Sequence, residues 1–263
     1  MRHIVVLCDY GLDDAAATVD LLDNGSVYST IDILPIGGNV PVDVSYRNVF
    51  RLLSHYPGDI SKVRIVDTTE IPQPNEYLKE IHGEDGMGDL FSTENMDLAV
   101  PILQYSDWVK TLPEDVLVLS LGPMTVVKDI FQTAGPRELV LMGGCINEEP
   151  NFNGYEFNHC LDREAFTYCL QYPHIAITLD TCRNPLLNIE KRIILGDDVL
   201  SQIMRRDQVL GVQRKEIGCY VWDDIAVKYL HHPEWFEKTL GVDRDGNSVT
   251  TLKYIRENHY LDI

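Results

Sequence analysis

The chain has 263 residues, of which 44% are hydrophobic, and its formal net charge at pH 7 is −19. This acidity argues against the basic surface of a nucleic-acid binder and against attraction to an anionic membrane. The length and the hydrophobic content are sufficient for one well-buried domain, which we expect to span residues 1–263.

The six cysteines are widely separated and form no CxxC or similar zinc-binding pair. We interpret them as free thiols, mostly buried, in a reducing compartment; they are Cys8, Cys145, Cys160, Cys169, Cys182 and Cys219. The N-terminal sequence MRHIVVLCDYG lacks the long apolar region of a signal peptide. No apolar run approaches the ~18 residues of a membrane span. These features predict a cytoplasmic protein.

Short β-branched apolar runs alternate with longer amphipathic runs along most of the chain. The apolar runs predict strands at 3–9, 31–38, 62–67, 115–122, 138–144 and 174–180. The amphipathic runs predict helices at 13–23, 44–56, 98–110, 123–133, 162–171 and 188–207. Strands that are apolar at every position are buried on both faces. Their alternation with helices predicts a doubly wound, mostly parallel α/β sheet.

The segment 234–255 differs from this pattern and predicts a late strand pair joined by an Asp-Gly turn. The sequence DRDGNS within it is superficially similar to a calcium-binding loop. Its glycine stands at the fourth place rather than the sixth, and no glutamate ends it. We therefore interpret DRDGNS as a turn.

Polar residues and glycines gather where several predicted strands end. They are Asp9 to Asp14, Gly38 and Asn39, Leu121 and Gly122, and Gly143 and Gly144. Ligands of open parallel sheets bind beyond the carboxyl ends of the strands. These segments therefore predict one shared pocket, although loops are polar in any protein.

Three aspartates, Asp9, Asp13 and Asp14, lie within six residues where a predicted strand meets a predicted helix. One of them can simply cap the helix, whose free N–H groups favour negative charge. Three carboxylates so close together favour a divalent cation, and oxygen ligands indicate Ca²⁺ or Mg²⁺. Asp223 and Asp224 begin a later helix-like run. They are interpreted either as distant ligands of the same metal or as a second set of capping acids.

Several motifs together resemble the nucleoside hydrolase family. The first, LCDYGLDDAAA, resembles the family signature DxDPGxDDAxA. The others follow in family order, so that the resemblance spans residues 4–228: GGN at 37–39, IHGEDGMGD at 81–89, LSLGPMT at 119–125, RELVLMGGCINEEPNFNGYEFNHCLDREA at 137–165 and VWDD at 221–224. The resemblance implies an enzyme that uses Ca²⁺ to hydrolyse the N-glycosidic bond of ribonucleosides, assembled as a homodimer or homotetramer.

The resemblance also implies a role for each matching residue. Asp9, Asp14, Asp223 and the backbone carbonyl of Leu121 would bind Ca²⁺, and Asp9 would also act as general base. The carboxylates would favour the positive charge of an oxocarbenium-like sugar. The expected contacts to ribose and base come from Asp13, Asn39, His82, Asn151, Glu156, Asn158 and Trp222. Asn151 is the least certain match, because its loop is one residue shorter than in the family.

Three positions depart from the family pattern. Leu7 replaces the first aspartate of the signature, so a hydrogen bond around the metal is expected to be missing. Tyr10 replaces the proline, and we expect it to reshape the pocket floor or to place a hydroxyl near the ligand. Trp222 stands where many members carry a histidine that serves as leaving-group acid. Purine-preferring relatives similarly carry tryptophan there, so we expect stacking on a purine, with packing under the helix start as the alternative.

These departures keep more than one function open. The leading hypothesis is a purine-preferring, Ca²⁺-dependent ribonucleoside hydrolase. The alternatives are a catalytically silent relative that binds a nucleoside or sugar, and a hydrolase of another ribosyl compound. The segment 185–220, which helps to enclose the base in the family, is shorter than usual. In every case the expected partner is a small molecule, with no nucleic acid and no membrane.

Overall fold

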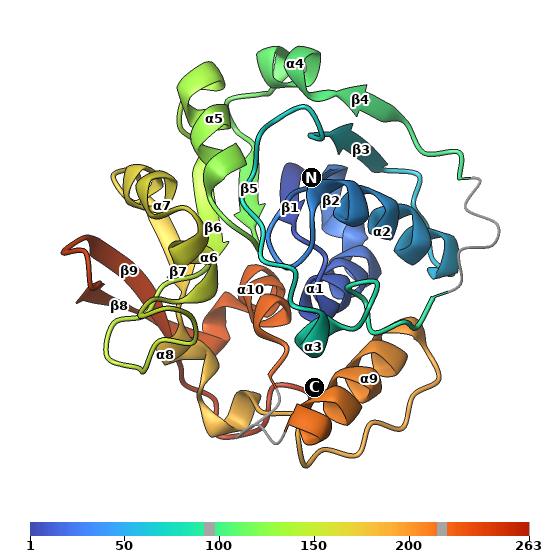
Figure 1. The fold of residues 1–263 in the computed structure, drawn as a ribbon, viewed down its shortest axis with the longest axis vertical. Helices are drawn as coiled ribbons and strands as arrows, with labels where there is room; N and C mark the ends of the chain where they lie inside the picture. The colour runs from blue at the N-terminus through green and yellow to red at the C-terminus, as the bar shows by residue number, and fades with distance from the viewer. Residues whose placement is uncertain (92–97, 215–219, 263) are drawn as a thin grey trace.

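The computed structural model describes residues 1–91, 98–214 and 220–262, and its centre is a nine-stranded sheet (Figure 1). The strands are β1 (Arg2–Cys8), β2 (Tyr28–Pro35), β3 (Val63–Asp67), β4 (Ile102–Gln104), β5 (Leu117–Ser120), β6 (Glu138–Met142), β7 (His174–Ile177), β8 (Phe236–Val242) and β9 (Ser248–Tyr254). They are arranged in the order β4-β3-β2-β1-β5-β6-β7-β9-β8. Every neighbouring pair is parallel except β8 and β9, which confirms the predicted mostly parallel sheet.

Helices cover both faces of this sheet (Figure 1). They are α1 (Leu12–Asp23), α2 (Val42–His55), α3 (Lys79–His82), α4 (Tyr105–Trp108), α5 (Thr125–Ala134), α6 (Phe157–Leu161), α7 (Arg163–Cys169), α8 (Leu179–Cys182), α9 (Val199–Arg214) and α10 (Trp222–His231). Short 3₁₀ turns lie at Gly25–Val27, Val109–Thr111, Pro185–Leu187 and Pro233–Trp235. None of the helices that the structure describes is long and apolar enough to cross a membrane.

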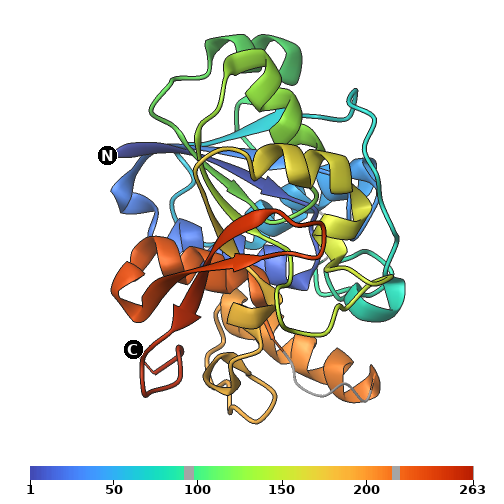
Figure 2. The same cartoon turned by 90° about the vertical axis from the view of Figure 1, so that its left-hand side faces the viewer.

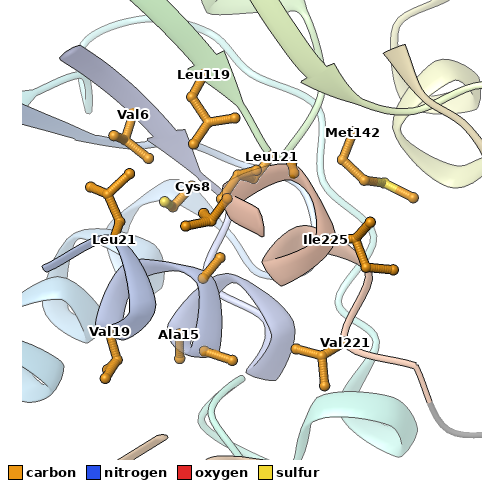
Figure 3. Close-up of a cluster of buried hydrophobic side chains, with 14 of the residues drawn as sticks. Val6, Cys8, Ala15, Val19, Leu21, Leu119, Leu121, Met142, Val221 and Ile225 are labelled. Atoms are coloured by element: carbon orange, nitrogen blue, oxygen red, sulfur yellow. The ribbon is translucent and has the colours of Figure 1, made fainter. Parts of the chain in front are cut away.

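The alternation of side chains along β1 divides the core into two clusters. Val6 and Cys8 face the cluster built with α1, α2 and α10, whereas Val5 and Leu7 face the cluster built with α5 and α7. Figure 3 shows the first cluster, with Val6 and Cys8 near residues of α1 and α10. Because β1 is buried on both faces, its sequence is apolar at nearly every position.

The hairpin of β8 and β9 confirms the predicted late strand pair. The two strands are antiparallel from Phe236 paired with Tyr254 to Val242 paired with Ser248. β9 also pairs with β7 in parallel through Ala176 and Thr251, so the hairpin extends the sheet. Figure 2 shows the hairpin lying along this side of the sheet, with its turn beside α6 and α7.

Two predicted helices begin later than expected. In the segment 98–110, β4 pairs with β3 at the sheet edge, and α4 starts only at Tyr105. Pro101 helps to explain this difference, because the residue before a proline favours extended backbone. In the segment 188–207, regular helix starts only at Val199. The Asp198 carboxylate accepts the Ser201 N–H at 2.8 Å and so fixes the helix start there.

The described cysteines agree with the expected free thiols. Cys8, Cys145, Cys169 and Cys182 are buried, and Cys160 is half-buried. Burial raises the pKa of the Cys8, Cys169 and Cys182 thiols, which makes them unreactive. Cys219 lies outside the described residues.

Candidate active site

A cavity of about 210 Å³ lies where β1 and β5 end. The strand order reverses between these two strands, which is where open α/β sheets bind ligands. The segments that the sequence assigned to one pocket do meet here. The lining residues are Asp13, Asn39, Leu78, Ile81, His82, Leu121, Met142, Asn151, Phe152, Glu156, Phe157, Asn158, Asp207, Tyr220, Trp222 and Asp223.

Three carboxylates gather at one wall of the cavity. One oxygen each from Asp13, Asp14 and Asp223 lies within 4.8 Å of the others, although Asp223 is some two hundred residues away along the chain. Asp13 and Asp14 lie in the first turn of α1, and Asp223 lies in the first turn of α10. α1 and α10 pack side by side, and this contact brings the three groups together.

Asp14 caps α1 and also belongs to the acidic group. Its carboxylate accepts the Gly11 N–H at 2.9 Å and the Asp9 N–H at 3.0 Å, so it caps the start of α1. It also contributes an oxygen to the group with Asp13 and Asp223. Helix capping therefore accounts for part of the cluster, and it does not explain why Asp223 is placed here as well.

Asp9 is fully buried and is held by Asn39. The Asn39 N–H donates to Oδ2 of Asp9 at 2.9 Å, and the Asn39 side-chain amide donates to Oδ1 at 2.8 Å. Gly38 and Gly122 enclose the same carboxylate. A Cβ at Gly38 would lie 1.9 Å from Oδ2 of Asp9, and one at Gly122 would lie 3.1 Å from its Cβ. Glycine is therefore required at 38 for this close approach.

The buried carboxylates have strongly raised pKa values in the absence of a cation. Burial raises the pKa of Asp9 to about 6, against the lowering effect of its hydrogen bonds. Burial, followed by the charges of Asp207 and Asp9, raises the pKa of Asp13 to about 7. The pKa values of Asp14 and Asp223 are also raised well above the usual range, first by burial and then by neighbouring aspartates.

This cluster fits a bound divalent cation. All of its donor atoms are oxygens, which Ca²⁺ and Mg²⁺ prefer. Oδ1 of Asp13 is buried and has no hydrogen-bond partner within the protein, so it is available to a cation or to a ligand hydroxyl. The gathered oxygens belong to Asp13, Asp14 and Asp223, whereas the sequence assigned Asp9, Asp14 and Asp223. The difference arises because Asn39 engages both oxygens of Asp9, and the metal-ligand role of Asp9 stays a prediction.

The carbonyl of Leu121 borders the same cavity and accepts the Asn158 side-chain amide at 3.0 Å. That amide also donates to the carbonyl of Met142 at 3.2 Å. Asn158 thus spans the ends of β5 and β6 and holds both strand ends in register. Its predicted contact to ribose would come from this fixed side chain.

Glu156 caps α6 and also lines the cavity. Its carboxylate accepts the N–H groups of Gly144 at 2.9 Å, Asn158 at 3.0 Å and His159 at 3.0 Å. Burial raises its pKa, and these three hydrogen bonds oppose the increase. A carboxylate offers about four acceptor positions, so one remains for a ligand hydroxyl.

His82 and Asn151 both line the cavity. Nδ1 of His82 accepts the Leu12 N–H at 3.2 Å, which leaves Nε2 as the protonated nitrogen of the neutral ring. Asn151 is exposed in the loop before the tight Phe152–Tyr155 turn. Both residues are therefore at the cavity, as the sequence predicted, and their contacts to a ligand stay predictions.

The remaining wall of the cavity is largely aromatic. Trp222 begins α10, and its ring lies 6.5 Å from that of Tyr220, with 32° between the planes. Phe152 and Phe157 pack edge to face with ring centroids 5.1 Å apart. Nε1 of Trp222 is buried without a hydrogen-bond partner. The placement of Trp222 in the wall agrees with a stacking role and does not exclude packing.

The other two departures from the family signature do not reach the cavity. Leu7 is fully buried in the apolar cluster on the opposite face of the sheet. Tyr10 is fully buried in the cluster beside α1, so the expectation that it reshapes the pocket floor or presents its hydroxyl to a ligand is wrong. The reason is its backbone, since Tyr10 has φ 51. Proline, with φ fixed near −65°, cannot adopt this conformation.

Sequence reasoning missed several cavity residues. Asp207 comes from α9, and Tyr220 follows the segment 215–219, which is not described. Leu78 directly precedes α3, and Ile81 lies within it. Nothing in their local sequence distinguishes them from ordinary helix or loop residues. The packing of α9 against both α1 and α3 brings Asp207 and α3 to the cavity.

Comparison with known proteins agrees with this architecture. A profile of the family described as inosine-uridine preferring nucleoside hydrolase matches residues 4–257. The non-specific ribonucleoside hydrolase RihC of Salmonella agona is 27% identical over 209 residues, which cover 76% of this chain and 66% of that protein. RihC of Salmonella newport is 30% identical over 171 residues, which cover 62% of this chain and 55% of that protein. The matches thus span less than two thirds of the length of these curated relatives.

Solved structures share the fold. A purine-preferring ribonucleoside hydrolase from Gardnerella vaginalis superposes with a TM-score of 0.71 at 19% identity, covering 97% of this chain and 93% of the other. An inosine-uridine preferring nucleoside hydrolase from Bacillus anthracis gives 0.70 at 16% identity, with 97% and 95% covered. The family profile spans nearly the whole chain, and the same motifs meet around one cavity. The chain therefore belongs to the inosine-uridine preferring nucleoside hydrolase family.

Proposed function

We propose that this protein hydrolyses the N-glycosidic bond of ribonucleosides, that it requires Ca²⁺, and that it prefers purine bases. The observation that carries the proposal is the acidic group of Asp13, Asp14 and Asp223 at one wall of a cavity. The same cavity holds polar side chains suited to sugar hydroxyls and an aromatic wall suited to a base. The names of the curated relatives and the family profile support this reading.

Asp14, Asp223 and the carbonyl of Leu121, with Asp9 or Asp13, would hold the cation. When bound, Ca²⁺ supplies a positive charge that lowers the pKa of a nearby water and orients the ribose hydroxyls. The cation would also relieve the repulsion among the buried carboxylates. We expect Ca²⁺ rather than Mg²⁺, because Mg²⁺ usually keeps several waters and binds only one or two carboxylates, whereas three carboxylates gather here.

The general base in this proposal is Asp9. Its carboxylate is held by two hydrogen bonds from Asn39, which fix its orientation before the substrate arrives. Removal of a proton from the attacking water typically contributes 10²- to 10⁴-fold to the rate. The surrounding carboxylates favour the positive charge that develops on the sugar in the transition state.

The sugar would be bound by Asp13, Asn39, Glu156 and Asn158. Oδ1 of Asp13 has no partner within the protein, so a ribose hydroxyl can donate to it. Asn158 and Glu156 are already held by hydrogen bonds to backbone groups beyond neighbouring strands. Their side chains therefore lose little conformational freedom when the sugar binds. Contacts of this kind position C1′ for attack.

The preference for purines rests on Trp222. Its indole lies in the cavity wall beside Tyr220, where a large flat base can stack. An indole N–H is not an acid, so it cannot protonate a leaving base as a histidine would. Purines, which offer basic ring nitrogens, are therefore better leaving groups here than pyrimidines.

One observation favours the alternative of a silent binding protein. Both oxygens of Asp9 are engaged by Asn39, and no histidine stands at 222. If these features abolish turnover, the protein would bind ribosides without releasing the base. Hydrolysis of another ribosyl compound is the third possibility, since the aromatic wall accepts more than one flat group.

The deciding experiment uses p-nitrophenyl riboside, because its leaving group needs no protonation. We expect Ca²⁺-loaded protein to release p-nitrophenol, and Asp9→Asn to lower kcat by at least about a hundredfold. If the loaded wild type and Asp9→Asn are equally inactive, hydrolysis is excluded. Calorimetry with inosine then separates the silent binder, which binds the nucleoside, from a protein of unrelated function. A single domain, a cytoplasmic location and a dimeric or tetrameric assembly remain predictions from the sequence.

A further inference from the structure

The DRDGNS turn of the β8–β9 hairpin is the part of the sequence that the proposed function does not use. It lies beside the segment 155–163, which carries Glu156 and Asn158 (Figure 2). Glu156, Phe157 and Asn158 of this segment line the cavity. The contacts between the turn and the segment are polar, numerous and centred on one residue, Asp245.

The Asp245 carboxylate accepts hydrogen bonds from three side chains of the segment. Two nitrogens of Arg163 donate to it, Nε to Oδ2 at 3.1 Å and Nη2 to Oδ1 at 2.5 Å. Nε2 of His159 lies 3.1 Å from Oδ2, and the Tyr155 hydroxyl donates to Oδ1 at 3.0 Å. Bidentate arginine–carboxylate pairs are the most directional of such contacts.

The three donors also pack against one another. The His159 ring stacks on Phe166 with centroids 4.1 Å apart and 12° between the planes. Tyr155 meets His159 edge to face at 5.1 Å, and the Arg163 guanidinium lies 4.2 Å above the Tyr155 ring. The His159 side chain is 1% exposed, so its hydrogen bond to Asp245 is shielded from water.

The turn is itself rigid, which makes it a suitable anchor. The Asp243 carboxylate accepts the N–H groups of Asp245 at 3.0 Å and Asn247 at 2.8 Å. Gly246 has φ 84, a conformation that favours glycine. Asp243 thus shapes the turn, and Asp245 is left to face the segment. The carboxylates of DRDGNS are occupied by these contacts, in agreement with a turn rather than a calcium loop.

The residues that contact Asp245 flank the residues that face the cavity. Tyr155 immediately precedes Glu156, and His159 immediately follows Asn158. The N–H of His159 also donates to Glu156 at 3.0 Å. A shift of Tyr155 or His159 would therefore move Glu156 and Asn158 directly, and a displacement of about 1 Å is enough to cost about a hundredfold in rate.

We propose that Asp245 is a positioning residue, which holds the segment 155–163 so that Glu156 and Asn158 meet the sugar. This inference rests on the proposed function for its effect on catalysis. The contacts of Asp245 with Tyr155, His159 and Arg163 are a property of the fold and do not depend on the proposed function. Asp245 makes no contact with the cavity, and it acts only through Tyr155, His159 and Arg163.

The test compares Asp245→Ala and the milder Asp245→Asn with Glu138→Ala. Glu138 forms a 2.6 Å ion pair with Arg2 at the opposite end of the strands, so its variant controls for loss of a surface ion pair. With p-nitrophenyl riboside, we expect kcat/KM to fall at least tenfold in Asp245→Ala, with KM rising more than kcat falls. Asp245→Asn should lose less, and Glu138→Ala should match the wild type.

Hydrogen–deuterium exchange provides a readout that does not require activity. We expect faster exchange in peptides covering 152–163 for both Asp245 variants, with peptides from β1 and β5 unchanged. Equal kinetics of Asp245→Asn, Asp245→Ala and Glu138→Ala would overturn the inference, as would faster exchange spread over the whole sheet. If the wild type itself is inactive, the proposed function fails, and local exchange alone decides whether Asp245 positions the segment.

Discussion

The two ends of the cavity are built differently. The end proposed for the sugar consists of residues just beyond strands, such as Asp9 and Asn39, which are hydrogen-bonded to each other, and of Asn158 in α6, whose amide donates to the Leu121 carbonyl beyond β5. The end proposed for the base consists of aromatic side chains beside the start of α10, Tyr220 and Trp222. Hydrogen bonds at strand ends therefore fix much of the end proposed for the sugar, whereas the end proposed for the base depends on where α10 begins.

This difference separates what the fold preserves from what it can vary. The group of Asp13, Asp14 and Asp223 needs the starts of α1 and α10 in register. The neighbouring Asp9 tolerates little change around it, because glycine is required at 38. The base end follows a segment, 188–198, without regular helix, in which Ile193 and Leu195 are exposed. We expect substitutions at the sugar end to affect every substrate, and substitutions at the base end to affect only some.

Among the changes that compare the two ends of the cavity, the largest effect is expected from Asp13→Asn. The substitution removes the charge of a buried acceptor that faces the cavity, and such a hydrogen bond is worth about 1.5–3 kcal/mol. We predict a tenfold to hundredfold loss in kcat/KM, about equal for inosine, uridine and p-nitrophenyl riboside. Asp43→Asn is the matched control, since Asp43 also lies in the first turn of a helix but is exposed. A loss confined to one substrate would contradict the assignment of Asp13 to the sugar end.

An intermediate effect is expected from removal of the metal, and it depends on pH. The pKa values of Asp9 and Asp13 are raised to about 6 and about 7 in the folded protein. The metal-free folded state therefore binds protons more tightly than the unfolded state, whose aspartates titrate near pH 3.9. The contribution of Asp9 and Asp13 to the free energy of unfolding is fully present below about pH 4. It is lost as the pH rises through about 6 to 7.

The measurement is thermal unfolding in EDTA between pH 5 and pH 8. Each pKa unit corresponds to about 1.4 kcal/mol, so we expect Tm to fall by several degrees as the pH rises. Saturating Ca²⁺ should abolish most of this fall, because it binds the ionised carboxylates of the folded state. A Tm that rises with pH in EDTA, or that Ca²⁺ leaves unchanged, would show that these carboxylates are not a cation site.

The smallest effect is expected at the base end, from Trp222→Ala. Aromatic stacking contributes about 0.5–1.5 kcal/mol beyond burial, so kcat/KM for inosine should fall about threefold to tenfold. The loss for uridine should be smaller, and Trp222→Phe should restore most of the activity towards inosine. If Trp222→Ala instead lowers turnover of all substrates equally, Trp222 packs under the start of α10 and does not select the base.

The sheet and the acidic cluster were predictable from sequence because both leave local signals. Fully apolar runs such as β1 indicate burial on both faces, and Asp9, Asp14 and Asp223 fall within recognisable motifs. The burial of Tyr10 in the core was not predictable. Its backbone has a φ of 51, whereas the proline that the family carries at this position has a negative φ. The roles of Asp207 and Asp245 depend on contacts between segments far apart in the chain. The sequence predicted a helix from residue 188 because the amphipathic pattern begins there. The helix α9 starts later because Asp198 caps it.

The central claim is that α1 and α10 together hold a cation between Asp14 and Asp223. Calorimetric titration of EDTA-treated protein with Ca²⁺ tests it most directly, with Asp223→Asn compared with the wild type. We predict one Ca²⁺ per chain in the wild type and a loss of binding of at least tenfold in Asp223→Asn. Asp43→Asn should bind as the wild type does. Equal Ca²⁺ binding by the wild type and Asp223→Asn, or no binding by either, would contradict the claim.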